Sequence, residues 1–271
     1  MTETSSFHWL ARSGYAARGL VYVLVAGLAL FSSLGGGDPN SKSALQLVLE
    51  QPFGRIWLGL IAIGLGGFIA WRLVQAFANA DGHPNSLKGY IARIGMLISG
   101  ITHLGLATFA ASQALTLGSG TQSGGEDAMS AWVIAQPFGR YLLAGVGLAV
   151  VGAGVAQIVK GYRHGYRKYM DIPANAGTVI DWICLYGLIA RGAIFLIIGV
   201  FFCYAAFAVD PDQAGGMSDA LAWVRQLPFG ALLYAFVALG LLAFGLYGFA
   251  EAAYRRIHVP AVAKYKRALP L

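Results

Sequence analysis

Two arginines inside apolar stretches are the residues of this 271-residue chain best suited to chemistry. Arg18 and Arg191 lie in segments long enough to cross a membrane, where a charged side chain costs at least about 2.5 kcal/mol and commonly marks a functional site. A guanidinium group binds carboxylates and phosphates well because its donors match their geometry. The two arginines therefore predict an anion site near the axis of a helical bundle.

Two structural interpretations compete with that site. Gly14 and Gly187 lie four residues before the two arginines and leave a groove along which each side chain can bend back toward the start of its helix. The guanidinium would then bind main-chain carbonyls or lipid phosphate. The other interpretation is a buried ion pair. Glu251 is the acid near the end of the last apolar segment, about 31 Å along its helix, and that depth suits Arg12 or Arg93 as its partner.

Polar side chains from the same odd-numbered apolar segments, or from the matching segment between them, would complete the site. Ser99 and His103 are four residues apart and share one helix face, and Tyr15 and Tyr22 flank the first arginine. A haem would need a second histidine at the depth of His103, which the positions of the other histidines do not provide. We therefore expect a hydrogen-bonded packing histidine, with no cofactor and no metal. The other histidines lie in tails or loops: His8, His83, His164 and His258.

The familiar catalytic patterns do not occur in this sequence. It has no HExxH motif, no GxSxG motif and no pair of carboxylates within one apolar segment. The basic residues are divided among short loops, so a nucleic-acid partner is also disfavoured. We predict a non-enzymatic protein whose partners are membrane lipids with anionic headgroups, and a protein partner or a second copy of the chain.

The elements that position these residues are membrane-spanning helices. The chain is 57% hydrophobic and 11% charged, with a mean hydropathy of +0.63, whereas soluble domains are roughly 25% charged. A span needs about 20 mostly apolar residues. Six segments qualify, and they predict an all-α integral membrane protein: 12–34, 54–78, 91–117, 140–160, 182–208 and 230–252.

The flanking charges predict the orientation of these spans. Most of the 19 lysines and arginines lie at the termini and in the connections 79–93 and 160–181, including the basic tail 257–271. The positive-inside rule then places both termini in the cytoplasm, and the net charge of +7 is first of all a topology signal.

The chain contains three copies of a two-span unit, at 9–80, 88–168 and 180–256. WLARSGYAARGLVY, YIARIGMLISGITH and WICLYGLIARGAIF align without gaps from Trp9, Tyr90 and Trp182. Two spans return the chain to the same side, so the copies are parallel and imply a pseudo-threefold axis. The copies differ at three aligned positions. The first position holds Arg12, Arg93 and Leu185 in the three copies, the second holds Arg18, Ser99 and Arg191, and the third holds Tyr22, His103 and Phe195.

Each unit also contains a Pro-Phe-Gly element before its second span. Pro52, Pro137 and Pro228 are predicted to start the even-numbered spans, because proline is tolerated in the first turn of a helix. Short amphipathic stretches precede them and predict interfacial helices on the periplasmic side. These stretches are 43–50, 127–135 and 218–225, with Asp127 or Ser130, and Ser218 or Asp219, as helix caps.

These repeated motifs resemble a bacterial membrane-protein family described only as a domain of unknown function (number 1206). The resemblance rests on ARxGYxARGxxY followed by QPFGR and extends from about Trp9 to Arg256. It implies a bacterial inner-membrane location and three two-helix units, and it brings no activity, substrate or catalytic residue.

Two functions are consistent with this sequence. A carrier or channel-like protein for a small anion or lipid headgroup would have a wet axial cavity lined by the polar residues above. A scaffold or accessory subunit that binds lipids or a protein partner would have an axis filled by Leu, Phe and Tyr. In either case we expect the odd-numbered spans to face the interior. The even-numbered spans would pack closely through Ala62 and Gly66, and through Ala149 and Ala153.

Overall fold

A computed structural model of the chain describes residues 3–32, 39–115, 136, 138–173, 176–208 and 215–257. Within these ranges the chain forms helices and no strand, and six of the helices are long and apolar enough to cross a membrane. This confirms the predicted all-α architecture with six spans. The six are α1 (Glu3–Ser32), α3 (Gly54–Phe77), α4 (Leu87–Ala114), α6 (Gly139–Tyr162), α7 (Gly177–Ala208) and α9 (Gly230–Tyr254).

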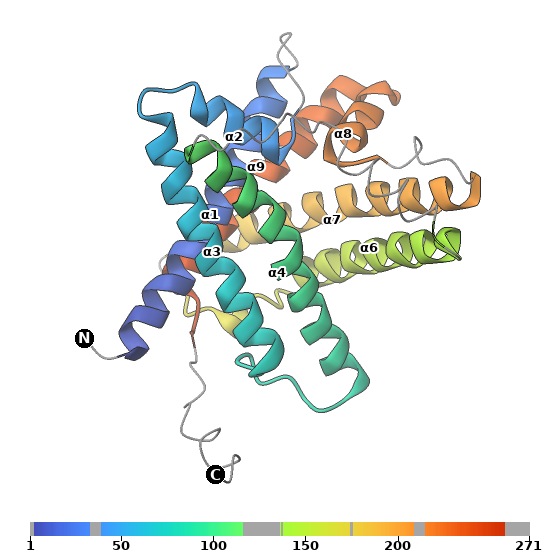
Figure 1. Ribbon diagram of the computed structural model, residues 1–271. Helices are drawn as coiled ribbons and strands as arrows, with labels where there is room; N and C mark the ends of the chain where they lie inside the picture. Colours follow the sequence, from blue (N-terminus) through green and yellow to red (C-terminus); the bar gives the residue numbers. More distant parts are fainter. Residues whose placement is uncertain are drawn as a thin grey trace.

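The strongest packing joins successive repeats in antiparallel pairs. These pairs are α3–α4, α6–α7 and α1–α9, so the last helix of each unit packs against the first helix of another (Figure 1). Inside a unit, α1 packs on α3 and α7 packs on α9. We call the end of the bundle where α1 begins and α9 ends the terminal side; the α3–α4 and α6–α7 connections lie there too.

The second repeat departs from this scheme because α4 and α6 do not form a comparable contact among the described residues. Figure 1 shows the α3–α4 pair running down the view and the α6–α7 pair running across it. The ring of six helices is therefore open between α4 and α6, while the other contacts follow the threefold relation of the repeats.

Side-chain size at the helix crossing explains this opening. In the first unit, a methyl group added at Gly64 would lie 2.6 Å from Ala17 Cβ, so the crossing has room only for glycine. The third unit repeats the arrangement with Gly240 against Ala190. The second unit has Ile98 and Ala149 at the matching positions, and both are exposed. A branched side chain opposite an alanine prevents the close approach that the other two units make.

The packing surfaces of the even-numbered helices differ from the predicted ones. Gly66 has no neighbour within 4 Å, and Ala149 and Ala153 are exposed, so the expected pairs of small residues do not form the interfaces. Glycines spaced by seven residues do so in the α6–α7 pair, where main chains touch. They are Gly147, Gly154 and Gly161 on α6, and Gly192 and Gly199 on α7.

The expectation that odd-numbered spans occupy the interior is also wrong. Helices α1 and α9 are the most buried of the six, whereas α4 and α6 are the least buried. The physical reason is the open second repeat, which leaves α4 and α6 at the edges of the bundle and places the α1–α9 pair between the two other pairs.

The Pro-Phe-Gly element forms a tight turn before each even-numbered helix. Phe53, Phe138 and Phe229 have φ angles of 61°, 62° and 60°, which is the left-handed region that few side chains adopt. The helices begin at the following glycines, so the predicted start at Pro52 and Pro228 is two residues early; Pro137 lies outside the described residues. Glycine is required there because a Cβ at Gly54 or Gly230 would overlap main-chain carbonyls of the preceding helix.

Two short helices lie on the side of the bundle opposite the terminal side, as predicted. Helix α2 (Ser41–Leu49) packs on α1, α3 and α4, and α8 (Met217–Gln226) packs on α7 and α9. Asn40 caps α2 by accepting hydrogen bonds from two main-chain N–H groups. The N-cap of α8 is Gly216 rather than the predicted Ser218 or Asp219, and Asp219 accepts a hydrogen bond from the Gly216 N–H. The predicted middle helix, with Asp127 and Ser130, lies outside the described residues.

The connection from α6 to α7 closes the terminal side through the short helix η1 (Arg167–Tyr169). Arg167 forms an ion pair with Asp181, and the Tyr166 hydroxyl donates to the same carboxylate at 2.8 Å. Burial raises the pKa of Tyr166 to about 12, so its hydroxyl stays a donor at neutral pH. The connection is thus fixed to the first turns of α7.

Candidate functional site

Two arginines on the terminal side cap the ends of even-numbered helices in the same way. Arg12 donates to the carbonyls of Ala252 and Ala253 at 2.7 and 2.5 Å, at the end of α9. Arg93 holds the matching position in the second repeat and donates to the last carbonyls of α3. A cation there also favours the negative end of the helix dipole. The carbonyl-binding interpretation therefore applies to these two arginines.

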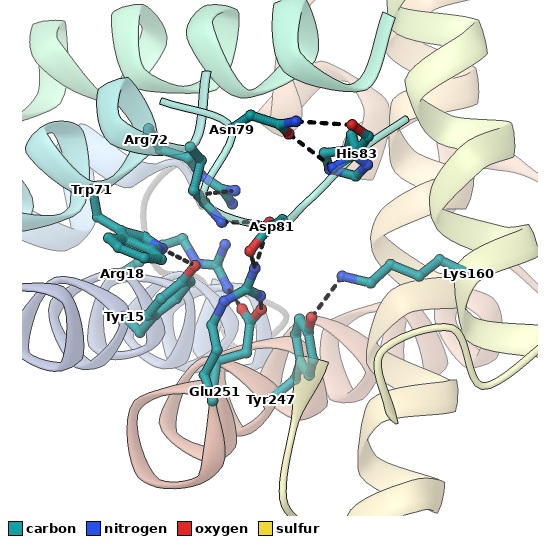
Figure 2. Close-up of polar contacts among 12 residues, drawn as sticks. Tyr15, Arg18, Trp71, Arg72, Asn79, Asp81, His83, Lys160, Tyr247 and Glu251 are labelled. Carbon is teal, nitrogen blue, oxygen red and sulfur yellow. Dashed lines mark hydrogen bonds and ion pairs between the residues drawn. The ribbon is translucent and has the colours of Figure 1, made fainter. Parts of the chain in front are cut away.

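Arg18 forms a buried ion pair with Glu251, and this overturns the expected pairing of Glu251 with Arg12 or Arg93. Its guanidinium lies 2.5 Å from one Glu251 oxygen, and Arg255 lies 2.7 Å from the other (Figure 2). The Arg18 side chain extends toward the start of α1, which brings it to the depth of Glu251 near the end of α9. The guanidinium is also stacked near the Phe68 and Phe244 rings, at 5.1 and 5.3 Å from their centroids.

The ion pair continues into a network of buried charges. Arg255 contacts Asp81 at 3.0 Å, the carboxylate of Asp81 accepts from Gln75 at 2.7 Å, and the Gln75 oxygen accepts from Arg72 at 3.0 Å. Burial lowers the pKa of Arg255, but its contacts with the tyrosine and carboxylates around it raise that pKa above the ordinary value, so the side chain stays cationic. The guanidinium groups of Arg18 and Arg255 therefore share two carboxylates, and Arg72 joins the network through Gln75.

Arg191 has no such partner. Among the described residues it forms no ion pair, and its Nε atom donates to the Tyr22 hydroxyl at 2.9 Å. Aromatic rings surround the guanidinium, with the centroids of Phe195 and Phe244 at 4.0 and 4.7 Å. Arg191 lies about 21 Å along α7 from Gly177, so the charge stands well inside the apolar segment. The two arginines that the repeat aligns therefore have opposite surroundings.

The register of the even-numbered helices explains this difference. Gln75, Lys160 and Glu251 each lie 22 residues after the phenylalanine that caps their helix. The α1–α9 pair is related by the repeat to the α7–α6 pair. Where Arg18 meets the carboxylate of Glu251, Arg191 therefore has Lys160 at the matching position. A lysine replaces the acid, so at this position Arg191 has a cation opposite it instead of a carboxylate. The carboxylate within electrostatic reach of Lys160 is Glu251 of α9, which Arg18 and Arg255 already share.

Both cations contact side chains of helix α9. Lys160 donates to the Tyr247 hydroxyl at 2.9 Å, which is the contact drawn for it in Figure 2. Arg191 packs on Phe244, and the Phe244 and Tyr247 rings are 5.6 Å apart between centroids. The cations thus flank neighbouring rings of α9. Gly161 packs on Leu188, so Lys160 is about 3 Å nearer to the terminal side than Arg191.

The other predicted site residues lie around this region in different roles. The Tyr15 hydroxyl accepts from the Trp71 indole at 2.9 Å and is fully buried. His103 packs its ring on Phe68 at 4.7 Å, and its Nδ1 lies 2.8 Å from the carbonyl of Ser99. Because a carbonyl only accepts, that nitrogen carries the proton, as expected for a packing histidine.

Large side chains fill the centre of the bundle at this depth. Five of them are at most 2% exposed: Tyr15, Phe68, Leu188, Phe244 and Tyr247. This is the filled axis that the scaffold hypothesis predicted.

Sequence reasoning missed three participants. Lys160 and Arg255 counted only as topology charges, and Asp81 was not singled out. The signal that identifies Lys160 was present in the sequence, since counting from Phe138 and Phe229 aligns it with Glu251. Asp81 lies in a connection outside the repeated segments, and no spacing rule places it against Arg255.

Comparisons with known proteins agree with the repeat. A family model described as Domain of Unknown Function (DUF1206) matches the chain three times, at residues 13–79, 94–164 and 186–255. The uncharacterized protein YxxB of Bacillus subtilis (strain 168) is 34% identical over 257 residues, covering 91% of this chain and 90% of that protein. No solved structure matches the chain.

Proposed function

The chain belongs to the family described as Domain of Unknown Function (DUF1206), and we propose that it is a non-enzymatic membrane protein that binds an anionic ligand with Arg191 and Lys160. The ligand class is a phosphate or a carboxylate, which guanidinium and ammonium groups both recognise. The ligand would occupy the position that the Glu251 carboxylate holds beside Arg18.

The observation that carries this proposal is the difference between two equivalent arginines. An uncompensated cation inside a membrane segment costs about 2.5–3.5 kcal/mol, and one hydrogen bond to Tyr22 offsets only part of that cost. Arg18 is balanced by Glu251 at 2.5 Å. A bound anion would give Arg191 and Lys160 the same balance, because its charge is opposite and its oxygens accept their hydrogen bonds.

The proposed location is the bacterial inner membrane, with both termini in the cytoplasm. The basic residues of the described chain gather at the terminal side, where Arg12, Arg93, Lys160, Arg167 and Arg255 lie. The positive-inside rule places such a side in the cytoplasm. The anion would then reach the site from the cytoplasmic half of the membrane.

The proposed activity is binding rather than catalysis. The two cations contact aromatic rings and donate to the hydroxyls of Tyr22 and Tyr247, and His103 holds its Nδ1 proton against the Ser99 carbonyl. A scaffold or accessory role that binds lipids or a protein partner is the second candidate, favoured by the filled axis of aromatic side chains. An anion that is bound without crossing the membrane fits both descriptions.

A thermal-shift titration of the purified protein with sn-glycerol 3-phosphate tests the proposal. A ligand that binds only the folded state raises the midpoint of unfolding, and the rise grows with ligand concentration. We expect a rise for the wild-type protein and none for the double variant Arg191→Gln/Lys160→Gln. Arg55→Gln serves as the control, because Arg55 is exposed at the opposite end of the bundle.

The proposal fails if neither this phosphate nor a simple carboxylate such as succinate raises the midpoint of the wild-type protein. It also fails if the double variant responds as strongly as the wild type, since the anion would then bind elsewhere.

A further inference from the structure

We infer that the opening between α4 and α6 seats the hydrocarbon chains of an anionic membrane lipid whose phosphate binds Lys160 and Arg191. This inference rests on the proposed function and names the class of ligand. The competing source of the same chemistry is a free phosphate from the aqueous phase, and the competing occupant of the opening is a helix of a second copy.

The opening is a trough of small side chains on α6. Going from the middle of the helix toward the side opposite the termini, the exposed residues of this face are Ala153, Gly152, Ala149 and Gly145. A Cβ added at Gly145 or Gly152 would meet no atom within 4 Å. The face is apolar, shallow and without a neighbour in the described structure, so it can accept an elongated apolar group.

The facing surface of α4 is apolar as well. Ile98 is 50% exposed and Ile91 is 60% exposed, and Gly95 between them has no neighbour within 4 Å. In the other units the matching residues contact a helix of the same unit: Gly14 meets Phe68, and Gly187 meets Phe244. The surface of α4 that corresponds to these packing surfaces therefore has no helix of its own unit against it, and another molecule can bind there.

Two cations lie at the terminal end of the trough. Lys160 is two residues from the end of α6, so it lies about 3 Å from the terminal end of that helix, with the small residues deeper along the same helix. Arg191 is about 3 Å deeper on α7. Its charge acts on His103 of α4, so the deeper cation lies within electrostatic reach of the helix on the other side of the opening. One cationic end followed by an apolar trough matches the order of groups in an anionic phospholipid.

Charge decides between a lipid and a second copy of the chain. A helix of a second copy would bring apolar side chains to the trough and leave the two cations unbalanced, and the described acids of this chain near the terminal side already have cationic partners. A phospholipid supplies both the apolar body and the negative charge. The observations therefore favour the lipid.

Native mass spectrometry of the detergent-purified protein with added phosphatidylglycerol or phosphatidylcholine of identical acyl chains tests the inference. We expect the wild-type protein to retain phosphatidylglycerol at least tenfold more tightly than phosphatidylcholine. Gly152→Leu adds a branched side chain to the trough at a glycine whose added Cβ would meet no atom within 4 Å, and it should weaken phosphatidylglycerol binding at least tenfold. Gly66→Leu is the matched control, since Gly66 is also an exposed helical glycine with no neighbour within 4 Å.

The response to sn-glycerol 3-phosphate separates this inference from the proposed function. Gly152→Leu should still bind the water-soluble phosphate, because the two cations are intact. If the wild-type protein binds the soluble phosphate but does not prefer phosphatidylglycerol, the lipid inference is wrong and the proposed function stands. Equal effects of Gly152→Leu and Gly66→Leu, or a dimer that Gly152→Leu dissociates, would also overturn the inference. No response to either phosphate overturns both.

Discussion

Helices α1 and α9 form one antiparallel pair, helices α7 and α6 form another, and the repeat relates the two. Both pairs place an arginine beside a glycine that touches the partner helix, at Gly19 and at Gly192. In the first pair the facing residue is Glu251, and in the second it is Lys160. A single change of sign replaces a closed ion pair with two cations, so the same position carries a structural ion pair in one pair of helices and the proposed binding residue in the other.

The first pair also has more support around it than the second. Glu251 receives a second guanidinium from Arg255, which Asp81 holds from the α3–α4 connection. The cluster joins the first and third repeats at the terminal side. The second pair packs just as closely through its glycines, but its two cations contact aromatic rings and tyrosine hydroxyls instead of carboxylates. Close packing and charge balance are therefore independent features of this fold.

Separate replacement of the two aligned arginines should give the largest difference in the free energy of unfolding between the two helix pairs. Arg18→Leu leaves Glu251 with one cation in a buried site, and we expect the free energy of unfolding to fall by about 3–5 kcal/mol. Arg191→Leu removes a cation that costs about 2.5–3.5 kcal/mol to bury together with one charged hydrogen bond of about 1.5–3 kcal/mol, so the two nearly cancel. Titration with SDS measures both, and equal losses would contradict the assignment.

The helix caps offer a smaller test of the same symmetry. Arg12→Leu and Arg93→Leu each remove hydrogen bonds to the last carbonyls of a helix, and we expect each to cost about 1 kcal/mol. The third repeat has Leu185 at this position. Leu185→Arg should therefore stabilise the end of α6 by about 0.3–1 kcal/mol in the same SDS titration. A destabilising Leu185→Arg would show that the repeats differ here by more than one side chain.

The sequence was sufficient to predict the spans, the repeats and the short helices α2 and α8. Apolar length and a register fixed by Trp9, Tyr90 and Trp182 are local signals, and the helices follow them. The turn at Phe53 was harder to predict from the sequence. Its positive φ results from the main chain closing on the preceding helix, and not from a preference of phenylalanine for that conformation.

Local sequence patterns could not predict the contacts between distant segments. The pairing of Glu251 depends on the direction of a long side chain and on which helices are neighbours, and depth along one helix led to the wrong partner. The opening between α4 and α6 depends on Ile98 and Ala149, which lie on different helices. Their effect can be recognised only once the two positions are known to correspond to the helix crossing of the other units.

Lys160→Glu tests the central claim most directly, because it gives α6 the carboxylate that α9 has at Glu251. One thermal-shift titration of this variant with sn-glycerol 3-phosphate supplies two readings. We predict a midpoint of unfolding above that of the ligand-free wild-type protein, since Arg191 gains an internal partner, and no further rise when the phosphate is added. A lower midpoint, or a ligand response equal to that of the wild type, would contradict the account.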